Sequence, residues 1–204
     1  MKALLFINGE APKKLPSLDG FDVIACTDGA FHYLKELDFP LDQLDFISGD
    51  FDSHSGEDSG VYQDKFIFTP DQDKTDFQKA LELLLEQGVS DVDVYGGSGG
   101  EMDHFLGNLT VASFFKEQLE IHFFDEFSTY FFIPNSFKTK VSDGQLVSLY
   151  PFPFTKNVTT KGLNWSLNGE DLDQTKRIGT RNIAVGEHLE IDFDEGNLLL
   201  FLGL

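Results

Sequence analysis

The segment FISGDFDS, residues 46–53, indicates both the fold and the chemistry of this chain. It begins with a short apolar run, typical of a buried strand, and Asp50 and Asp52 follow two positions apart. Residues two apart in an extended segment project to the same side, so we expect the two carboxylates to point together. They repel each other unless a cation or protons lie between them, which indicates a site for a hard cation such as Mg²⁺.

A second acidic segment, TPDQDKTDF at residues 69–77, strengthens this interpretation. Asp73 and Asp76 lie three apart, directly before an amphipathic helix predicted over residues 76–87. Ligands of open α/β sheets bind at the carboxyl ends of strands, beside helix N-termini. The alternative is that these acids are solvated loop residues, because 35 of the 204 residues are Asp or Glu. The placement of both pairs at element ends favours a functional site.

The first two thirds of the chain alternate strand-like and helix-like segments, which predicts an α/β domain with a largely parallel sheet. After residues 134–136 the helical stripes disappear, and short alternating segments predict a small antiparallel β domain, a sandwich or a barrel. We place the boundary so that the domains are residues 1–135 and 136–204. The expected strands are 3–8, 22–26, 44–48, 66–69, 92–95, 120–124, 129–133, 147–150, 158–163, 165–167, 188–193 and 198–202, and the expected helices are 31–37, 76–87 and 104–118.

Composition limits the possible partners and compartment. The formal net charge is -20, so the surface repels nucleic-acid phosphates and anionic membranes but is able to attract a cationic small molecule. We therefore expect no nucleic-acid and no membrane partner. The single cysteine, Cys26, lies in an apolar run and is expected to be a buried core thiol. No segment resembles a signal peptide or a membrane span, which predicts a cytoplasmic protein.

A glycine-rich loop, residues 96–100, lies between a predicted strand and a predicted helix. Glycines let the backbone approach an anion, while the helix N-terminus adds partial positive charge. The loop is not a P-loop, because no Gly-Lys-Ser/Thr follows, and Met102 stands where a dinucleotide-binding motif needs its third glycine. A tight turn capped by Asp103 explains the loop nearly as well.

Three single residues each leave two roles open. Asp28 follows a buried strand and either points into the same crevice or caps a helix. His104 is either a general base or a hydrogen-bonding residue at a helix start. Lys74, between the paired aspartates, either contacts a phosphate or forms a surface ion pair.

Together these residues resemble the thiamine pyrophosphokinase (thiamine diphosphokinase) family over most of the chain. The resemblance is carried by Asp28-Gly29-Ala30, GDFDS at 49–53, TPDQDKTDF at 69–77, GGSGGEMDHFLGN at 96–108, SLYPF at 148–152, TKGLNWSLN at 160–168 and GTRN at 179–182. The combination of GDFDS with DKTD is specific.

The resemblance implies a Rossmann-like nucleotide-binding α/β domain followed by a small antiparallel β-sandwich domain. It implies transfer of the terminal pyrophosphoryl group of ATP to the hydroxyl of thiamine, with release of AMP and with Mg²⁺ as cofactor. It also implies a homodimer in which each active site is shared between the α/β domain of one subunit and the β domain of the other.

By position, the resemblance assigns roles to residues of this chain. The catalytic acids are Asp50, Asp52, Asp73 and Asp76, of which Asp50, Asp52 and Asp76 hold the metal. The residues on the ATP and phosphate side are Asp28, Gln72, Lys74, Gly97, Gly99, Gly100, Asp103, His104 and Asn108. The residues on the thiamine side are Trp165, Arg181 and Asn182.

Two positions depart from the family pattern. Glu101 stands where members commonly carry an Arg able to pair with phosphate, which leaves that contact unassigned. Arg181 replaces the Ser of a Ser-Asn motif, and a cation beside cationic thiamine is unfavourable, so we expect Arg181 to point elsewhere, toward the pyrophosphate.

Two other functions stay open from the sequence. A Mg²⁺-dependent nucleotidyl- or glycosyltransferase also uses an Asp-x-Asp pair after a strand. A non-catalytic nucleotide or thiamine sensor is the alternative outside the enzymes. Metal-dependent release of AMP discriminates the kinase from both.

Overall fold

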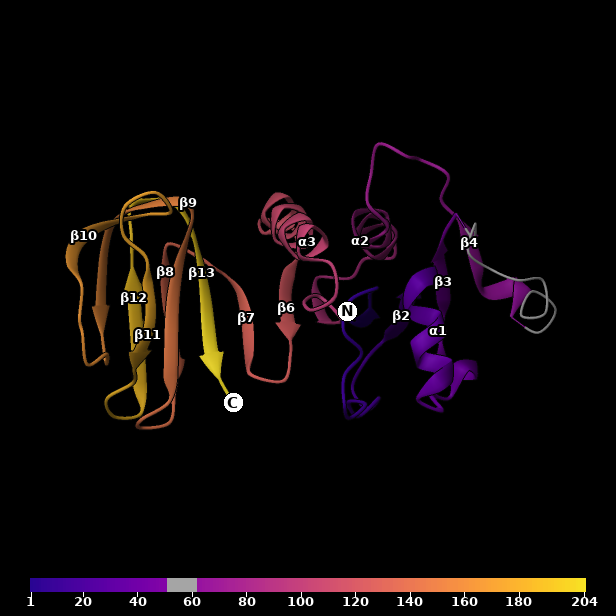
Figure 1. The fold of residues 1–204 in the computed structure, drawn as a ribbon, viewed down its shortest axis with the longest axis horizontal. Helices are drawn as coiled ribbons and strands as arrows, with labels where there is room; N and C mark the ends of the chain where they lie inside the picture. The colour runs from indigo at the N-terminus through magenta and orange to yellow at the C-terminus, as the bar shows by residue number, and fades with distance from the viewer. Residues whose placement is uncertain (51–61) are drawn as a thin grey trace. The chain divides into compact units, whose positions relative to one another are not determined.

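The computed structural model describes residues 1–50 and 62–204 (Figure 1). Contacts between residues group the chain into two units, Met1–Glu126 and Phe127–Leu204. Helices occur only in the first unit among the described residues, and antiparallel strands make up the second. The structure is therefore mixed α/β with strands predominating, and the predicted α/β class is confirmed at this level.

The first unit contains a parallel sheet whose central strand is β1. The strand order is β4-β3-β2-β1-β5-β6, and every pairing within it is parallel. The strands are β1 (Lys2–Phe6), β2 (Val23–Thr27), β3 (Phe46–Gly49), β4 (Phe66–Phe68), β5 (Asp91–Tyr95) and β6 (Glu120–Phe124). The helices are α1 (Asp28–Glu36), α2 (Asp76–Glu86) and α3 (Met102–Phe115), with short 3₁₀ helices at Leu41–Gln43 and Gln63–Lys65.

Helices cover both faces of this sheet. Leu4 and Phe6 of β1 share a buried cluster with Phe31 of α1. On α2, the Phe77 ring lies 5.7 Å from the Phe123 ring of β6, which belongs to the face of the sheet that carries Leu5. Because successive strand residues point to opposite faces, α1 and α2 pack on opposite sides. Helix α3 lies beside α2 (Figure 1).

Helix α2 begins and ends where its sequence predicts. The Thr75 Oγ1 accepts a hydrogen bond from the Gln78 backbone N–H at 3.2 Å, so Thr75 is the N-cap of the helix. The Gln78 Nε2 donates to the Glu82 Oε1 at 3.3 Å, one turn further along the helix. Gly88, with φ 82°, follows the last turn. Within the described part of the chain, no helix is both long and apolar enough to cross a membrane.

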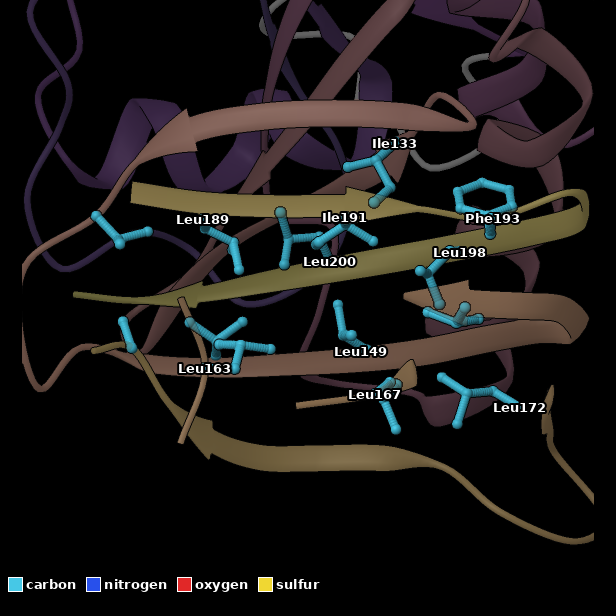
Figure 2. Packing of buried hydrophobic residues seen from close by; sticks show 14 of the residues in the cluster. Ile133, Leu149, Leu163, Leu167, Leu172, Leu189, Ile191, Phe193, Leu198 and Leu200 are labelled. Carbon is cyan, nitrogen blue, oxygen red and sulfur yellow. The ribbon is translucent and has the colours of Figure 1, made fainter. Parts of the chain in front are cut away.

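The second unit is built around the long strand β9. The strand order is β7-β13-β9-β12-β8, and β10 and β11 also pair with β9, every pair being antiparallel. The strands are β7 (Ser128–Ile133), β8 (Ser136–Lys140), β9 (Leu146–Lys161), β10 (Asn168–Asp173), β11 (Gly179–Ile183), β12 (His188–Asp192) and β13 (Glu195–Gly203). A large buried cluster lies within this unit, and Figure 2 shows Leu149, Leu198 and Leu200 in it.

One predicted strand, residues 165–167, is wrong. The backbone N–H of Trp165 donates to the Asn182 side chain, and that of Leu167 donates to the Thr160 hydroxyl. Because side chains rather than a neighbouring strand accept these hydrogen bonds, the segment forms a loop and not a strand.

Strand β7, expected at the end of the α/β part, pairs with β13, from Ile133↔Leu198 to Ser128↔Gly203. This pairing joins segments about seventy residues apart and places β7 in the second unit. Local sequence patterns do not contain such long-range information. The domain boundary at 135/136 stays a prediction.

We expect the Cys26 thiol to be unreactive in the folded protein. The side chain has no exposed surface, and burial, followed by the nearby Asp28 carboxylate, raises its pKa well above the ordinary value. Because the thiolate is the nucleophile, reaction with Ellman's reagent at pH 8 should be at least about 100-fold slower than in guanidinium-unfolded protein. Equal rates in both conditions would contradict the placement of Cys26 in the core.

Candidate functional site

A cavity of about 340 Å³ lies at the carboxyl edge of the parallel sheet. We call it the edge cavity. It is bordered by residues that follow β1 and β3, by the last residue of β2 and by the N-terminal parts of α2 and α3. It lies beside the point where the strand order reverses between β1 and β5. Its lining residues are Ile7, Asn8, Thr27, Asp50, Gln72, Lys74, Thr75, Asp76, Phe77, Lys79, Asp103, His104, Gly107 and Asn108.

Asp50 lies directly after β3 and is half-buried in the wall of the edge cavity. The Gln72 Nε2 donates a hydrogen bond to the Asp50 Oδ2 at 3.0 Å. The neutral amide therefore fixes one carboxylate oxygen without adding a charge. Asp52, the second member of the predicted pair, lies outside the described residues.

Asp76 is the first residue of α2 and also lines the edge cavity. Its Oδ1 lies 2.7 Å from the Nζ of Lys79, one turn further along the helix. The Lys79 side chain is only 6% exposed, and its Nζ also donates to the Thr69 carbonyl oxygen at 2.9 Å. Asp50 and Asp76, predicted as metal ligands, thus face one cavity, each held by a different donor.

Lys74 forms the ion pair that was the alternative to a phosphate contact. Its Nζ lies 2.8 Å from the Glu82 Oε2 and 3.9 Å from the Asp71 Oδ2. The hydrogen bond to Glu82 raises the Lys74 pKa, and Asp71 adds to this. Lys74 nevertheless borders the edge cavity, whereas Asp73 is exposed and outside its lining.

Asp28 is buried at the start of α1, but it is not the residue that precedes the helix. Thr27 occupies the N-cap position and makes no side-chain capping bond, while the Asp28 Oδ1 accepts from the Gly29 N–H at 2.7 Å. A Cβ added at Gly49 would lie 2.2 Å from the Asp28 Oδ2. The carboxylate therefore packs against the residue that precedes Asp50.

The glycine loop packs on the chain that follows β1. Gly96 has φ 77°, and a Cβ added there would lie 2.1 Å from the Ile7 carbonyl oxygen. The Glu10 N–H donates to the Ser98 carbonyl oxygen at 2.8 Å, and the Asn108 Nδ2 donates to the Gly97 carbonyl oxygen at 3.0 Å. These contacts fit the tight-turn interpretation of the loop. Gly97, Gly99 and Gly100 do not line the edge cavity.

At the start of α3, Asp103 and His104 both line the edge cavity. Glu101, not Asp103, occupies the position before the helix, and the Asp103 Oδ1 accepts from the His104 N–H at 3.1 Å. Asp103 is therefore a first-turn residue, and the predicted cap at that position is wrong. The Glu101 carboxylate lies 3.6 Å from the His104 Nε2.

Three predicted residues gather in the second unit. The Trp165 side chain is 59% exposed, and the Asn182 amide holds its backbone twice, accepting from the N–H at 3.1 Å and donating to the carbonyl oxygen at 2.8 Å. The neighbouring Arg181 has φ 59°, and its N–H donates to the Ser148 hydroxyl at 2.9 Å. Asn182 therefore fixes the loop that presents Trp165.

Sequence reasoning missed Asn8, Thr27 and Lys79 in the lining of the edge cavity. Asn8 and Thr27 are polar residues at the ends of strands. The same position at a strand end indicated a functional role for Asp28. Lys79 follows Asp76 by three positions, and side chains at this spacing are neighbours on a helix. The sequence therefore contains the signal that predicts this ion pair.

A second cluster of charged residues lies at the opposite, amino-terminal edge of the sheet. Ligand atoms of Asp91, Asp93 and His122 lie within 4.8 Å of one another, and the Lys2 Nζ lies 2.9 Å from the Asp93 Oδ2. Burial raises the Asp93 pKa, and Lys2 opposes that rise. Lys2 thus supplies the positive charge for this cluster.

Two family profiles and several curated proteins match this chain. The profile described as thiamin pyrophosphokinase, catalytic domain, matches residues 17–123, and that described as thiamin pyrophosphokinase, vitamin B1 binding domain, matches residues 135–198. "Thiamine pyrophosphokinase 3" of Oryza sativa subsp. japonica is 28% identical over 89% of this chain and 79% of its own length.

Solved structures share the fold. The thiamin pyrophosphokinase family protein of Enterococcus faecalis has a TM-score of 0.85 and 24% identity, covering 100% of this chain and 99% of its own. Thiamin pyrophosphokinase of Geobacillus thermodenitrificans has a TM-score of 0.83 and 22% identity, covering 100% of this chain and 98% of its own. Since the two family profiles together match most of its length, the chain belongs to the thiamin pyrophosphokinase family.

Proposed function

We propose that the chain transfers the pyrophosphoryl group of ATP to the hydroxyl of thiamine, giving thiamine diphosphate and AMP. The observation that carries this proposal is the convergence of Asp50 and Asp76 in one cavity, beside the N-termini of α2 and α3. Carboxylates and helix N-termini together suit a metal–phosphate complex. Membership of the family identifies the acceptor as thiamine and the donor as ATP.

The edge cavity is the proposed site of the ATP phosphates. Gln72, Lys74, His104 and Asn108, whose side chains carry hydrogen-bond donors, line it, and the first turns of two helices add backbone N–H groups. The remaining residues assigned to this side by resemblance lie in the adjoining loops and helix starts; they are Asp28, Gly97, Gly99, Gly100 and Asp103. Their part in binding is proposed.

Magnesium is the proposed cofactor, held by Asp50 and Asp76 together with Asp52, which lies outside the described residues. The donor set fits, because Mg²⁺ prefers carboxylate oxygens, and the two described carboxylates face the same cavity. When bound, the metal offsets the negative charge on the phosphate oxygens during transfer.

The residues around the metal site orient the reacting groups. Gln72 fixes the Asp50 carboxylate, and Lys79 fixes that of Asp76, so little reorganisation is needed when substrates bind. Asp73 is proposed to assist as a further acid of the same segment. Pyrophosphoryl transfer through a loose transition state needs no strong base at the thiamine hydroxyl.

The thiamine side is proposed to lie on the second unit. Thiamine is aromatic and positively charged, so the exposed ring of Trp165 suits it through stacking and cation–π attraction. Asn182 holds the loop of that ring, and Arg181 is proposed to point toward the pyrophosphate rather than toward the cation.

The proposal also covers the two domains, the assembly and the location of the protein. The first domain, residues 1–135, is a Rossmann-like nucleotide-binding domain, which the parallel strand order supports. The second, residues 136–204, is an antiparallel β-sandwich that binds thiamine and forms a homodimer with active sites shared across the interface. A cytoplasmic location suits an enzyme that uses ATP, and it stays a prediction.

The reaction itself tests the proposal. Protein incubated with Mg²⁺, ATP and thiamine should yield thiamine diphosphate and AMP in equal amounts, measured by chromatography. Asp50→Asn should lower kcat by at least about 1,000-fold because a charge in the metal site is lost. Thiamine monophosphate with ADP would show transfer of a single phosphoryl group. Binding of both ligands without any product would favour a sensor.

The sole tryptophan provides a test of the thiamine side. Asn182→Ala removes both hydrogen bonds to the Trp165 backbone, so acrylamide should quench the fluorescence more strongly and the KM for thiamine should rise about tenfold. Asn135→Ala, which removes a side-chain hydrogen bond to the Asp194 carbonyl oxygen in the same unit, is the matched control. Equal quenching in both variants would mean that Asn182 does not hold the loop.

Mixing two inactive variants tests the shared site. In a dimer with shared sites, Asp50→Asn and Trp165→Ala combine into one intact and one doubly altered site. After random exchange of subunits, the mixture should recover about a quarter of wild-type activity at low thiamine concentration. A site contained within one subunit would give no recovery at any mixing ratio.

A further inference from the structure

Lys79 is a buried lysine in the wall of the edge cavity. Its side chain is 6% exposed, and its Nζ contacts the Asp76 Oδ1 at 2.7 Å and the Thr69 carbonyl oxygen at 2.9 Å. Asp76 itself is 44% exposed. The pair therefore has an enclosed cation and a carboxylate that remains open to the cavity.

Local stability does not explain a lysine at this position. Removing an ammonium from water is costly, and a buried ion pair is often no more stable than apolar side chains of similar volume. Lys79 also lies in the first turns of α2, where the helix dipole disfavours a cation. A methionine would fill the same space without the desolvation cost and without the unfavourable interaction with the helix dipole. The positive charge at this position therefore requires an explanation other than stability.

The contacts of Lys79 connect the two described carboxylates proposed as metal ligands. Thr69 follows β4, and its N–H donates to the Gly49 carbonyl oxygen at 2.9 Å. Gly49 immediately precedes Asp50. Through Thr69, the ammonium thus ties the Asp76 carboxylate to the strand end that carries Asp50.

We propose that Lys79 is a positioning residue, the built-in counter-cation of Asp76. This role rests on the proposed function, and it has two consequences. The ammonium holds the Asp76 carboxylate in place at the cavity wall before any metal binds. Its positive charge also weakens binding of a free divalent ion, because like charges close together repel.

These two consequences separate positioning from a purely structural role. Without the charge, Asp76 is free to turn, so catalysis is slower, but the carboxylates attract a divalent ion more strongly. A lysine that only stabilised the fold would, when removed, weaken the metal site and catalysis together.

The test compares Lys79→Met with Lys79→Arg and Lys2→Met. Lys79→Met removes the charge and keeps much of the volume, and Lys79→Arg keeps the charge. Lys2→Met is the control for loss of a cation away from the edge cavity, because it removes the partner of the buried Asp93 at the opposite edge of the sheet. Mn²⁺ is titrated into each protein without nucleotide by calorimetry, and kcat and KM are measured with Mg²⁺, ATP and thiamine.

We expect Lys79→Met to bind Mn²⁺ about tenfold more tightly than wild type and to lose at least about tenfold in kcat, with the KM for thiamine within about twofold. Lys79→Arg should keep the wild-type Mn²⁺ affinity and recover part of kcat. Lys2→Met should lower the unfolding temperature and leave kcat unchanged, and any Mn²⁺ that it gains at the cluster of Asp91, Asp93 and His122 should not affect catalysis.

Unchanged or weaker Mn²⁺ binding by Lys79→Met would overturn the proposal, as would a kcat within twofold of wild type. If Lys79→Met does not fold, Lys79→Gln, a neutral donor able to keep the Thr69 contact, is titrated in its place under the same criteria. Failure of the proposed function is distinguishable, because wild-type protein would then form no AMP.

Discussion

Parallel pairing of β1 with both β2 and β5 is the constraint on which the site depends. From β1 the chain builds outward through β2, β3 and β4, and it then returns to the other side of β1 with β5. The connections after β1 and β5 diverge at this point, which leaves an opening at the carboxyl edge. Gly96 enters this narrow region against the Ile7 carbonyl oxygen, where no side chain fits. The position of the edge cavity is therefore a direct consequence of the strand order.

The carboxylates at this edge illustrate three ways of holding negative charge. Asp28 accepts from a backbone N–H, Asp50 from the Gln72 amide, and Asp76 from the Lys79 ammonium. The first two donors leave the charge of the carboxylate in place, whereas the third neutralises it. In a chain with a formal net charge of -20, these donors stabilise three acids that gather at one edge of the sheet.

The sequence predicted what depends on neighbouring residues and missed what depends on distant ones. The strands and helices of the first unit follow from apolar runs and from the amphipathic pattern over residues 76–87. The cavity lining of Asp50 and Asp76 follows from the rule that strand ends converge. The pairing of β7 with β13, by contrast, joins segments far apart, and the Trp165 loop depends on Asn182, seventeen residues away. Neither the strand pairing nor the contact with Asn182 is recognisable from a local sequence pattern.

Under the proposed function, the two substrates are handled by different kinds of structure. A phosphate–metal complex needs charges at fixed positions, which strand ends and helix starts provide because their backbones are fixed by the sheet. An aromatic cation needs one exposed ring face, which a loop is able to present if its backbone is held. The Asn182 amide does this by replacing the missing strand partners of Trp165 with its own donor and acceptor. On this proposal, a change in the loop of Trp165 alters the acceptor side, whereas the carboxylates at the sheet edge keep the donors that hold them.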